Sequence, residues 1–109
     1  MKLTKRTYPI SIMGQNGPYK LDVDGWVIEG IPFAVRNYRG RWAPDHLPTG
    51  HGTTGIGSAS TRAESVRITL DLYRYGKRIG LKWNRSDMKR VATKAQLAKI
   101  KAWRKLNGY

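Results

Sequence analysis

The chain contains no cysteine, a single phenylalanine and no long apolar run. The absence of cysteine excludes disulfide bonds, thiolate zinc sites and cysteine nucleophiles. It is compatible with a reducing compartment, and a cytoplasmic location is expected. No stretch has the length and apolarity of a membrane span, and no apolar run of about seven residues follows the basic amino end. We therefore expect neither contact with a membrane nor a secretory signal.

Acidic residues are scarce in the last third of the chain. From Arg74 to Tyr109 there are twelve Lys and Arg residues and one acid, Asp87, whereas Met1 to Tyr73 has nine basic residues and six acids. Roughly +11 of the net charge of +14 is therefore held by 36 residues. A surface this basic repels itself and is best tolerated when a dense anion neutralises it, which makes nucleic acid the first candidate partner. The alternative is a solvated basic surface with no partner.

The length of 109 residues fits one domain with a modest core. We expect a sheet-and-helix core over residues 19–76 and a basic carboxyl-terminal helix over residues 86–107. Four Trp and six Tyr residues favour rings with a polar handle, which suit a half-wet surface. The ordinary role of Trp in a small domain is core packing, and most of these rings are expected there.

Alternation of polar and apolar residues predicts a small antiparallel sheet. Residues 19–24 alternate with a period of two, as in a half-buried strand, and Gly25 permits a turn after them. Residues 37–40 have hairpin-turn chemistry, because Asn and Gly accept positive φ. A long loop is expected over residues 44–53. The further strand candidates are residues 26–29, 31–36, 41–43 and 54–57.

Two helices are expected after the strands. Thr61 and Glu64 fit a capping box, in which the Thr hydroxyl accepts from the Glu64 amide and the carboxylate bonds back to the amide of Thr61. An apolar stripe predicts a helix over residues 62–75, which Gly76 would end in the left-handed conformation. A second helix begins near Asp87, and almost all its polar positions are Lys or Arg. The expected fold class is α+β, with a small antiparallel sheet of three to four strands packed on one helix, plus a basic carboxyl-terminal helix.

Four short motifs resemble parts of a small DNA-binding domain. They are Gly40-Arg41-Trp42-Ala43, Pro48-Thr49-Gly50, Gly55-Ile56-Gly57 and Thr61-Arg62-Ala63-Glu64-Ser65. Over about residues 31–76 the chain resembles the domain shared by plant ethylene-response factors and the amino-terminal arm-binding domains of phage and transposon integrases. The resemblance implies a three-stranded antiparallel sheet that packs on one helix and reads the DNA major groove with its exposed strand face. Where that family has a regular second strand, residues 44–52 hold two prolines.

The resemblance implies a reading face on the predicted hairpin. Its candidate residues are Arg36, Arg39, Arg41, Trp42 and, at the loop edge, His46. Arginine suits guanine because its planar fork donates to both base acceptors, worth roughly 1–3 kcal/mol of discrimination. The alternative is that these are solvated hairpin charges around a core tryptophan. Phosphate contacts are expected from the carboxyl-terminal third, namely from Lys77, Arg78, Lys82, Arg85, Lys89, Arg90, Lys94, Lys99, Lys101, Arg104 and Lys105.

Two further patterns have simpler interpretations. The glycine-rich run at residues 52–60 precedes the first predicted helix, where amides and the helix dipole favour an anion such as a phosphate. A tight turn into a capped helix is the simpler interpretation. Asp45 and His46 resemble the Asp-His pair of one-metal nucleases, but the predicted helix supplies no further His or Asn ligand. We therefore expect no catalytic residue, no metal site and no cofactor.

The sequence predicts a small basic nucleic-acid-binding protein that is not an enzyme. Duplex DNA is the favoured partner, and the resemblance to integrase domains favours a phage or mobile element as the source. Two alternatives stay open. One is an RNA-binding protein. The other is a phage-type inhibitor or accessory protein that docks on an acidic face of a host enzyme or ribonucleoprotein.

Overall fold

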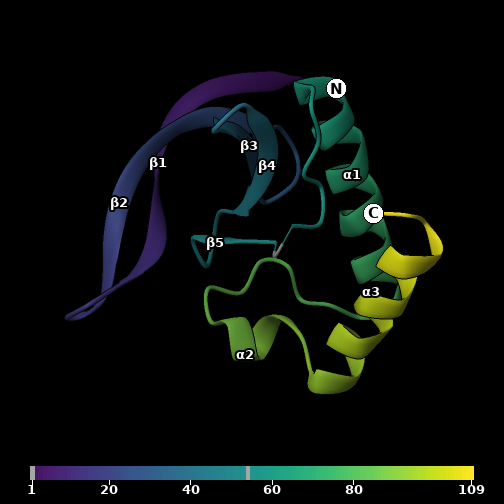
Figure 1. Cartoon of the computed structure of the whole chain (residues 1–109). Helices are drawn as coiled ribbons and strands as arrows, with labels where there is room; N and C mark the ends of the chain where they lie inside the picture. Colours follow the sequence, from purple (N-terminus) through teal and green to yellow (C-terminus); the bar gives the residue numbers. More distant parts are fainter. Residues whose placement is uncertain (1, 54) are drawn as a thin grey trace.

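A curved antiparallel sheet forms from the first half of the chain, and three helices follow it (Figure 1). The computed structural model describes residues 2–53 and 55–109. In chain order the elements are β1 (Leu3–Gly14), β2 (Gly17–Ile28), β3 (Phe33–Tyr38), β4 (Arg41–His46), β5 (His51–Gly52), α1 (Arg62–Arg78), α2 (Met88–Val91) and α3 (Lys94–Leu106). The predicted α+β class is confirmed. The described residues form five strands, where three to four were expected.

Each strand pairs with its neighbours in the chain, in the order β1-β2-β3-β4-β5. β1 and β2 form a long hairpin, with pairs from Leu3 and Ile28 at its base to Gly14 and Gly17 at its tip. β1 also approaches the end of the sheet, because the amide of Ser11 donates to the carbonyl of Gly50 at 2.9 Å. The sheet is therefore rolled so that its first strand contacts the turn before its last.

Gly25 lies inside β2 and not in a turn. A Cβ at this position would lie 2.6 Å from the Tyr8 hydroxyl and 2.9 Å from the Val35 carbonyl oxygen. The missing side chain therefore makes room for the Tyr8 ring of the adjacent strand. The two strands predicted at residues 19–24 and 26–29 are one continuous strand.

The hairpin turn predicted at residues 37–40 is confirmed. Its two central residues, Arg39 and Gly40, have φ of 52° and 86°, which matches the type I′ turn that suits the twist of antiparallel strands. The amide of Gly40 donates to Asn37 Oδ1 at 3.2 Å. This closes the turn between β3 and β4.

β4 continues beyond residue 43, so the loop predicted from residue 44 is wrong there. The amide of Trp42 donates to the Ala59 carbonyl at 2.8 Å, away from β3. Because amides alternate along a strand, the nitrogen of Pro44 also faces away from β3, and its missing hydrogen costs no bond to that strand. The short strand predicted over 54–57 is replaced by a turn at residues 55–57, and residue 54 lies outside the described residues.

The amino end of α1 agrees in part with the predicted capping box. Thr61 caps the helix, and its hydroxyl accepts from the Glu64 amide at 3.2 Å. The Glu64 carboxylate, however, accepts two bonds from Arg67 one turn later, at 2.5 and 3.1 Å. A stronger charged partner thus takes the carboxylate away from the cap.

The carboxyl end of α1 lies beyond the predicted stop. Gly76 is inside the helix, where a Cβ would lie 2.4 Å from a ring atom of Trp83. The helix ends at Arg78, and Gly80 takes the left-handed conformation with φ of 95°. Gly76 is therefore required for packing and not for termination.

The single basic helix predicted after Asp87 is two helices. Asp87 caps α2 as expected, and its carboxylate accepts from the Lys89 amide at 3.0 Å. Ala92 then adopts an extended conformation, with φ of −147° and ψ of 145°. Thr93 caps α3 with a complete capping box to Gln96, and this Thr and Gln three residues apart are a second start signal in the sequence.

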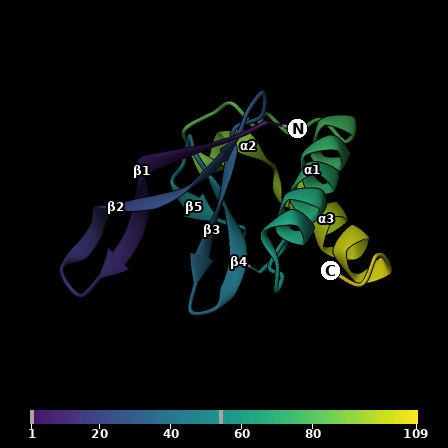
Figure 2. The ribbon, with the colours of Figure 1, turned by 90° about the horizontal axis from the view of Figure 1, so that it is seen from above.

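The core lies between the sheet and the helices. Phe33 and Val35 of the sheet pack in one cluster with Leu72 of α1, Val91 of α2 and Ile100 of α3. Figure 2 shows α1 and α3 side by side on one side of the sheet, with the β1–β2 hairpin extending away from them. A smaller cluster of Tyr8, Ile10 and Ala34 fills the opposite face of the sheet. The helices therefore form a layer on one face of the sheet.

Candidate nucleic-acid interface

The expected phosphate contacts all lie on the end of α1, on α2 and α3 and on the loop between α1 and α2. We call this set of residues the basic layer: Lys77, Arg78, Lys82, Arg85, Lys89, Arg90, Lys94, Lys99, Lys101, Arg104 and Lys105. Ten of them are exposed, and Arg104 is half-buried. In Figure 1 these elements form the lower and right-hand part of the molecule, away from the tip of the β1–β2 hairpin. The charge clustering seen in the sequence therefore persists in the fold.

Acidic groups do not neutralise the basic layer. Within residues 2–53 and 55–109, the acids that form ion pairs are Asp45, Glu64 and Asp71, and their partners are Arg36, Arg67 and Arg74. Asp87, the acid closest in sequence, accepts a backbone bond at the cap of α2. Most of the basic layer therefore faces solvent uncompensated.

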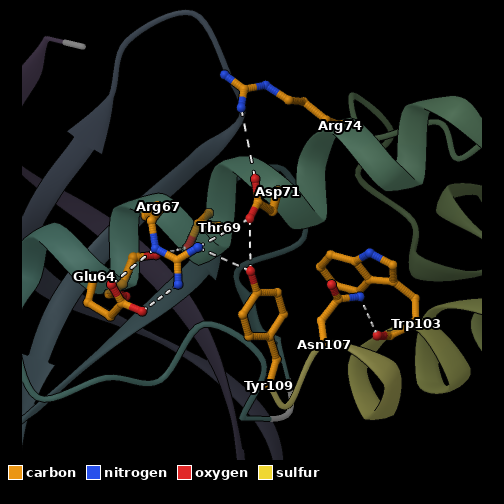
Figure 3. A network of polar contacts seen from close by, with 9 residues as sticks. Glu64, Arg67, Thr69, Asp71, Arg74, Trp103, Asn107 and Tyr109 are labelled. Atoms are coloured by element: carbon orange, nitrogen blue, oxygen red, sulfur yellow. Dashed lines mark hydrogen bonds and ion pairs between the residues drawn. The ribbon is translucent and has the colours of Figure 1, made fainter.

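A polar network fastens α3 to α1 and also engages the acids of α1 (Figure 3). The hydroxyl of Tyr109 donates to Asp71 at 2.8 Å and accepts from Arg67 at 3.2 Å. The bond from Arg67 also holds the pKa of the Glu64 carboxyl below its usual value. Nearby, the rings of Tyr75 and Trp103 stack with their centroids 5.1 Å apart. Both acids are thus occupied within the protein and do not oppose an anionic partner directly.

Three lysines form a line along the solvent side of α3. Lys94, Lys101 and Lys105 are spaced by seven and four residues, so at 100° per residue they fall within about 40° of one another around the helix. Ile100 is buried on the inner side of the same helix. The line is about 16 Å long, and duplex DNA carries about one charge per 1.7 Å of its axis. A duplex segment of the same length carries several phosphates that the three lysines can face.

A second group of cations surrounds a recess next to α1. The recess has a volume of about 380 Å³, and its lining includes Lys77, Lys82 and Arg85 together with the rings of Tyr73 and Trp83. The ammonium of Lys77 lies 5.5 Å from the centre of the Tyr73 ring. Three cations around one recess can approach a single phosphate group from several sides.

Arg36, expected on the reading face, is committed inside the protein. Its Nε donates to Asp45 at 2.8 Å, and the Tyr8 hydroxyl donates to the same carboxylate oxygen at 2.7 Å. Asp45 is only 4% exposed. Burial raises the pKa of Tyr8, and the bond to Asp45 raises it further, so the phenol remains a donor. Arg36 therefore neutralises a buried carboxylate.

The turn of the β3–β4 hairpin presents cations around an exposed ring. The guanidinium groups of Arg36 and Arg39 lie 5.5 and 5.1 Å from the centre of the Tyr38 ring, which is 55% exposed. Tyr38 was not among the predicted site residues. An aromatic residue between arginines in the sequence was the available signal. Arg41, on the return strand, is exposed and donates its Nε to Ser58 at 3.0 Å.

Trp42 does not belong to a reading face with its neighbours. Side chains alternate along β4, and Trp42 packs against the main core on the helix side of the sheet. Its backbone pairs with Ala59 through two bonds of 2.8 Å. Of the two interpretations of Trp42, the core tryptophan fits this position, and the base-reading residue does not.

His46 ends β4 beside the turn at residues 47–50, but its ring lies in the core and so cannot belong to an exposed reading face. The ring is 3% exposed and packs between Phe33 and Trp83. Nε2 lies 2.5 Å from the Trp83 carbonyl and Nδ1 lies 2.8 Å from the Thr49 hydroxyl. Burial lowers the pKa of His46, so the ring is neutral; Nε2–H donates to the carbonyl, and Nδ1 accepts from the hydroxyl.

Asp45 and His46 do not converge on a common site. Adjacent residues of a strand point to opposite faces of the sheet. Asp45 accordingly bonds to Tyr8 and Arg36 on one face, whereas His46 packs against Trp83 on the other. Among the described residues, no three His, Asp or Glu side chains are grouped so that they could hold a metal ion.

Comparison with known protein families, with curated proteins and with solved structures finds no match to this chain. No helix within the described ranges is long and apolar enough to cross a membrane. The geometry and charge of the basic layer are therefore the main guide to function.

Proposed function

We propose that this protein binds nucleic acid, with duplex DNA preferred, and that the basic layer supplies most of the affinity. One observation supports this above the others: ten exposed cations lie on the three helices and on the loop between α1 and α2, and the acids near them are occupied by other groups. Neutralising phosphates with Lys and Arg releases condensed counterions from the nucleic acid, which favours binding regardless of sequence.

The β3–β4 hairpin is the candidate for base contacts. Arg39 at its turn and Arg41 on β4 remain exposed, whereas Arg36 is held by Asp45. A two-stranded ribbon is narrow enough for the major groove, which is about 12 Å wide. The proposal therefore assigns affinity to the helices and sequence preference to two arginines of the hairpin.

The test is a titration of labelled duplex DNA, single-stranded DNA and duplex RNA, measured by fluorescence anisotropy at several salt concentrations. The informative variant changes Lys94, Lys101 and Lys105 to Gln. Each true phosphate contact contributes about 0.9 to the slope of log affinity against log salt, so the slope should flatten by up to about 2.7. Affinity should fall equally for all duplex sequences.

The matched control changes Lys2, Lys5 and Lys20 to Gln. These residues are also exposed, and their loss changes the net charge by the same amount, but Lys5 and Lys20 lie on the β1–β2 hairpin and Lys2 directly precedes it. The control should keep most of the affinity and slope. Equal weakening in both variants would show that only net charge matters, and no binding at low salt would overturn the proposal. Tighter binding to duplex RNA than to duplex DNA would leave the role of the basic layer intact but make RNA the partner.

A further inference from the structure

A cavity of about 390 Å³ lies among the three helices, the loop after α1 and the segment around β5. Leu81, Val91, Leu97 and Ile100 contribute to its wall. Ligand pockets in proteins have volumes of about 300–1,000 Å³ and are mostly apolar. The cavity is therefore large enough for a small molecule, and it shares the wall residues Leu81 and Trp83 with the recess beside Lys82.

The polar groups in the wall of the cavity are already bonded within the protein. Both ring nitrogens of His46 have partners, in Thr49 and Trp83. The hydroxyl of Thr53 donates to the Ile56 carbonyl. A polar group that enters the cavity would lose its bonds to water without gaining replacements there, which is unfavourable. The buried part of any occupant must therefore be apolar.

The remaining lining residues combine exposed apolar side chains with positive charge. Met88 of α2 and Leu97 of α3 line the cavity although they are 40% and 48% exposed. Lys101 and Arg104 also line it. Arg104 donates to the Tyr109 carbonyl at 2.9 Å, whereas Lys101 is exposed and has no side-chain bond or ion pair to another described residue. The site thus joins an apolar interior to an available cation.

We propose that this cavity binds a single-chain amphiphile with an anionic head group, a carboxylate of the fatty-acid type. The alkyl tail lies against Val91 and Ile100, and the carboxylate lies at Lys101. The positive charge of Lys101 favours an acid over an amine. Because the polar groups of the wall are already hydrogen-bonded within the protein, the cavity favours a hydrocarbon tail over a sugar or a nucleotide. The inference does not depend on nucleic-acid binding, although Lys101 belongs both to the cavity wall and to the basic layer.

The test is calorimetric titration of the full chain with dodecanoate below its micelle concentration, beside hexanoate and dodecyltrimethylammonium. Dodecanoate should bind at one site, at least tenfold more tightly than either comparison compound. Leu97→Trp narrows the cavity and should weaken dodecanoate at least tenfold, whereas Leu106→Trp, at a position 87% exposed and outside the lining, should not.

A pair of charge reversals tests the head-group contact. Lys101→Glu should weaken dodecanoate severalfold, whereas Lys105→Glu, one turn along the same helix and outside the lining, should have little effect. Melting curves verify that each variant is folded. Equal effects of the two reversals would overturn the proposal in favour of adhesion to the basic surface. Binding of dodecyltrimethylammonium as tight as that of dodecanoate would also overturn it, because the alkyl tail alone would then account for the affinity. If Leu97→Trp does not fold, the reversal pair still decides.

Discussion

Replacing Gly76 with alanine should destabilise the protein, although the same change stabilises an open helix by about 1 kcal/mol. The new Cβ would lie 2.4, 2.6 and 2.7 Å from three atoms of the Trp83 ring, where ordinary carbon contacts are about 3.5–4 Å. The ring would have to move by about 1 Å. Its Nε1 donates to the Tyr73 carbonyl at 3.0 Å, and its ring makes a T-shaped contact with the Phe33 ring at a centroid distance of 5.1 Å.

Overpacking of this kind costs about 1–3 kcal/mol, and weakening the indole bond adds about 1 kcal/mol. After the gain in helix propensity, the net loss is about 1–3 kcal/mol, which corresponds to a fall in Tm of roughly 5–15 °C for a chain of this size. Thermal and urea unfolding followed by circular dichroism measure it. In a Trp83→Phe background the penalty should shrink, with a coupling of about 1 kcal/mol or more.

Gly52→Ala is the matched control, because its nearest new contact would be the Pro44 carbonyl oxygen at 3.9 Å. This variant should change stability by about 0.5 kcal/mol or less. If Gly76→Ala raises the Tm, the ring of Trp83 does not occupy the space above Gly76, and the packing argument fails.

Two further predictions concern buried ionisable groups. The folded-state pKa of His46 lies below its ordinary 6.5, so below about pH 6.5 the unfolded state binds a proton that the folded state does not. As the pH falls from about 6.5 toward the folded pKa, the free energy of unfolding should decrease by up to about 1.4 kcal/mol per pH unit. Urea melts of the parent, of His46→Gln and of the exposed-site control His51→Gln measure this dependence. If His46→Gln loses stability with falling pH as steeply as the parent does, the prediction is contradicted. Arg36→Gln should cost about 3 kcal/mol, because it leaves the Asp45 carboxylate buried with Tyr8 as its remaining described partner. Adding Asp45→Asn should recover part of that loss in the same assay; no recovery would mean that Arg36 acts through packing alone.

The fold class could be predicted because its signals are local. The turn at Arg39 and Gly40 and the cap at Thr61 depend on residues within a few positions of one another. The roles of Gly25 and Gly76 could not be predicted, since each glycine accommodates a ring from another element, Tyr8 in one case and Trp83 in the other. A glycine read alone indicates a turn, and only the packed structure shows which ring it admits.

The parts of the candidate site also differ in whether nearby or distant residues determine their environment. The basic layer could be placed from the sequence because its residues follow one another along a contiguous stretch, and adjacent helices keep them together. The environments of Arg36 and His46 depend instead on partners as far as 37 residues away, where Trp83 bonds to His46 and Tyr8 shares Asp45 with Arg36. A single charge or imidazole has no sequence pattern that shows whether such a partner exists. The ion pair with Asp45 therefore commits Arg36, burial encloses His46, and Trp42 packs against the core. Under the proposed function, most of the affinity for a polyanion would then come from the helices.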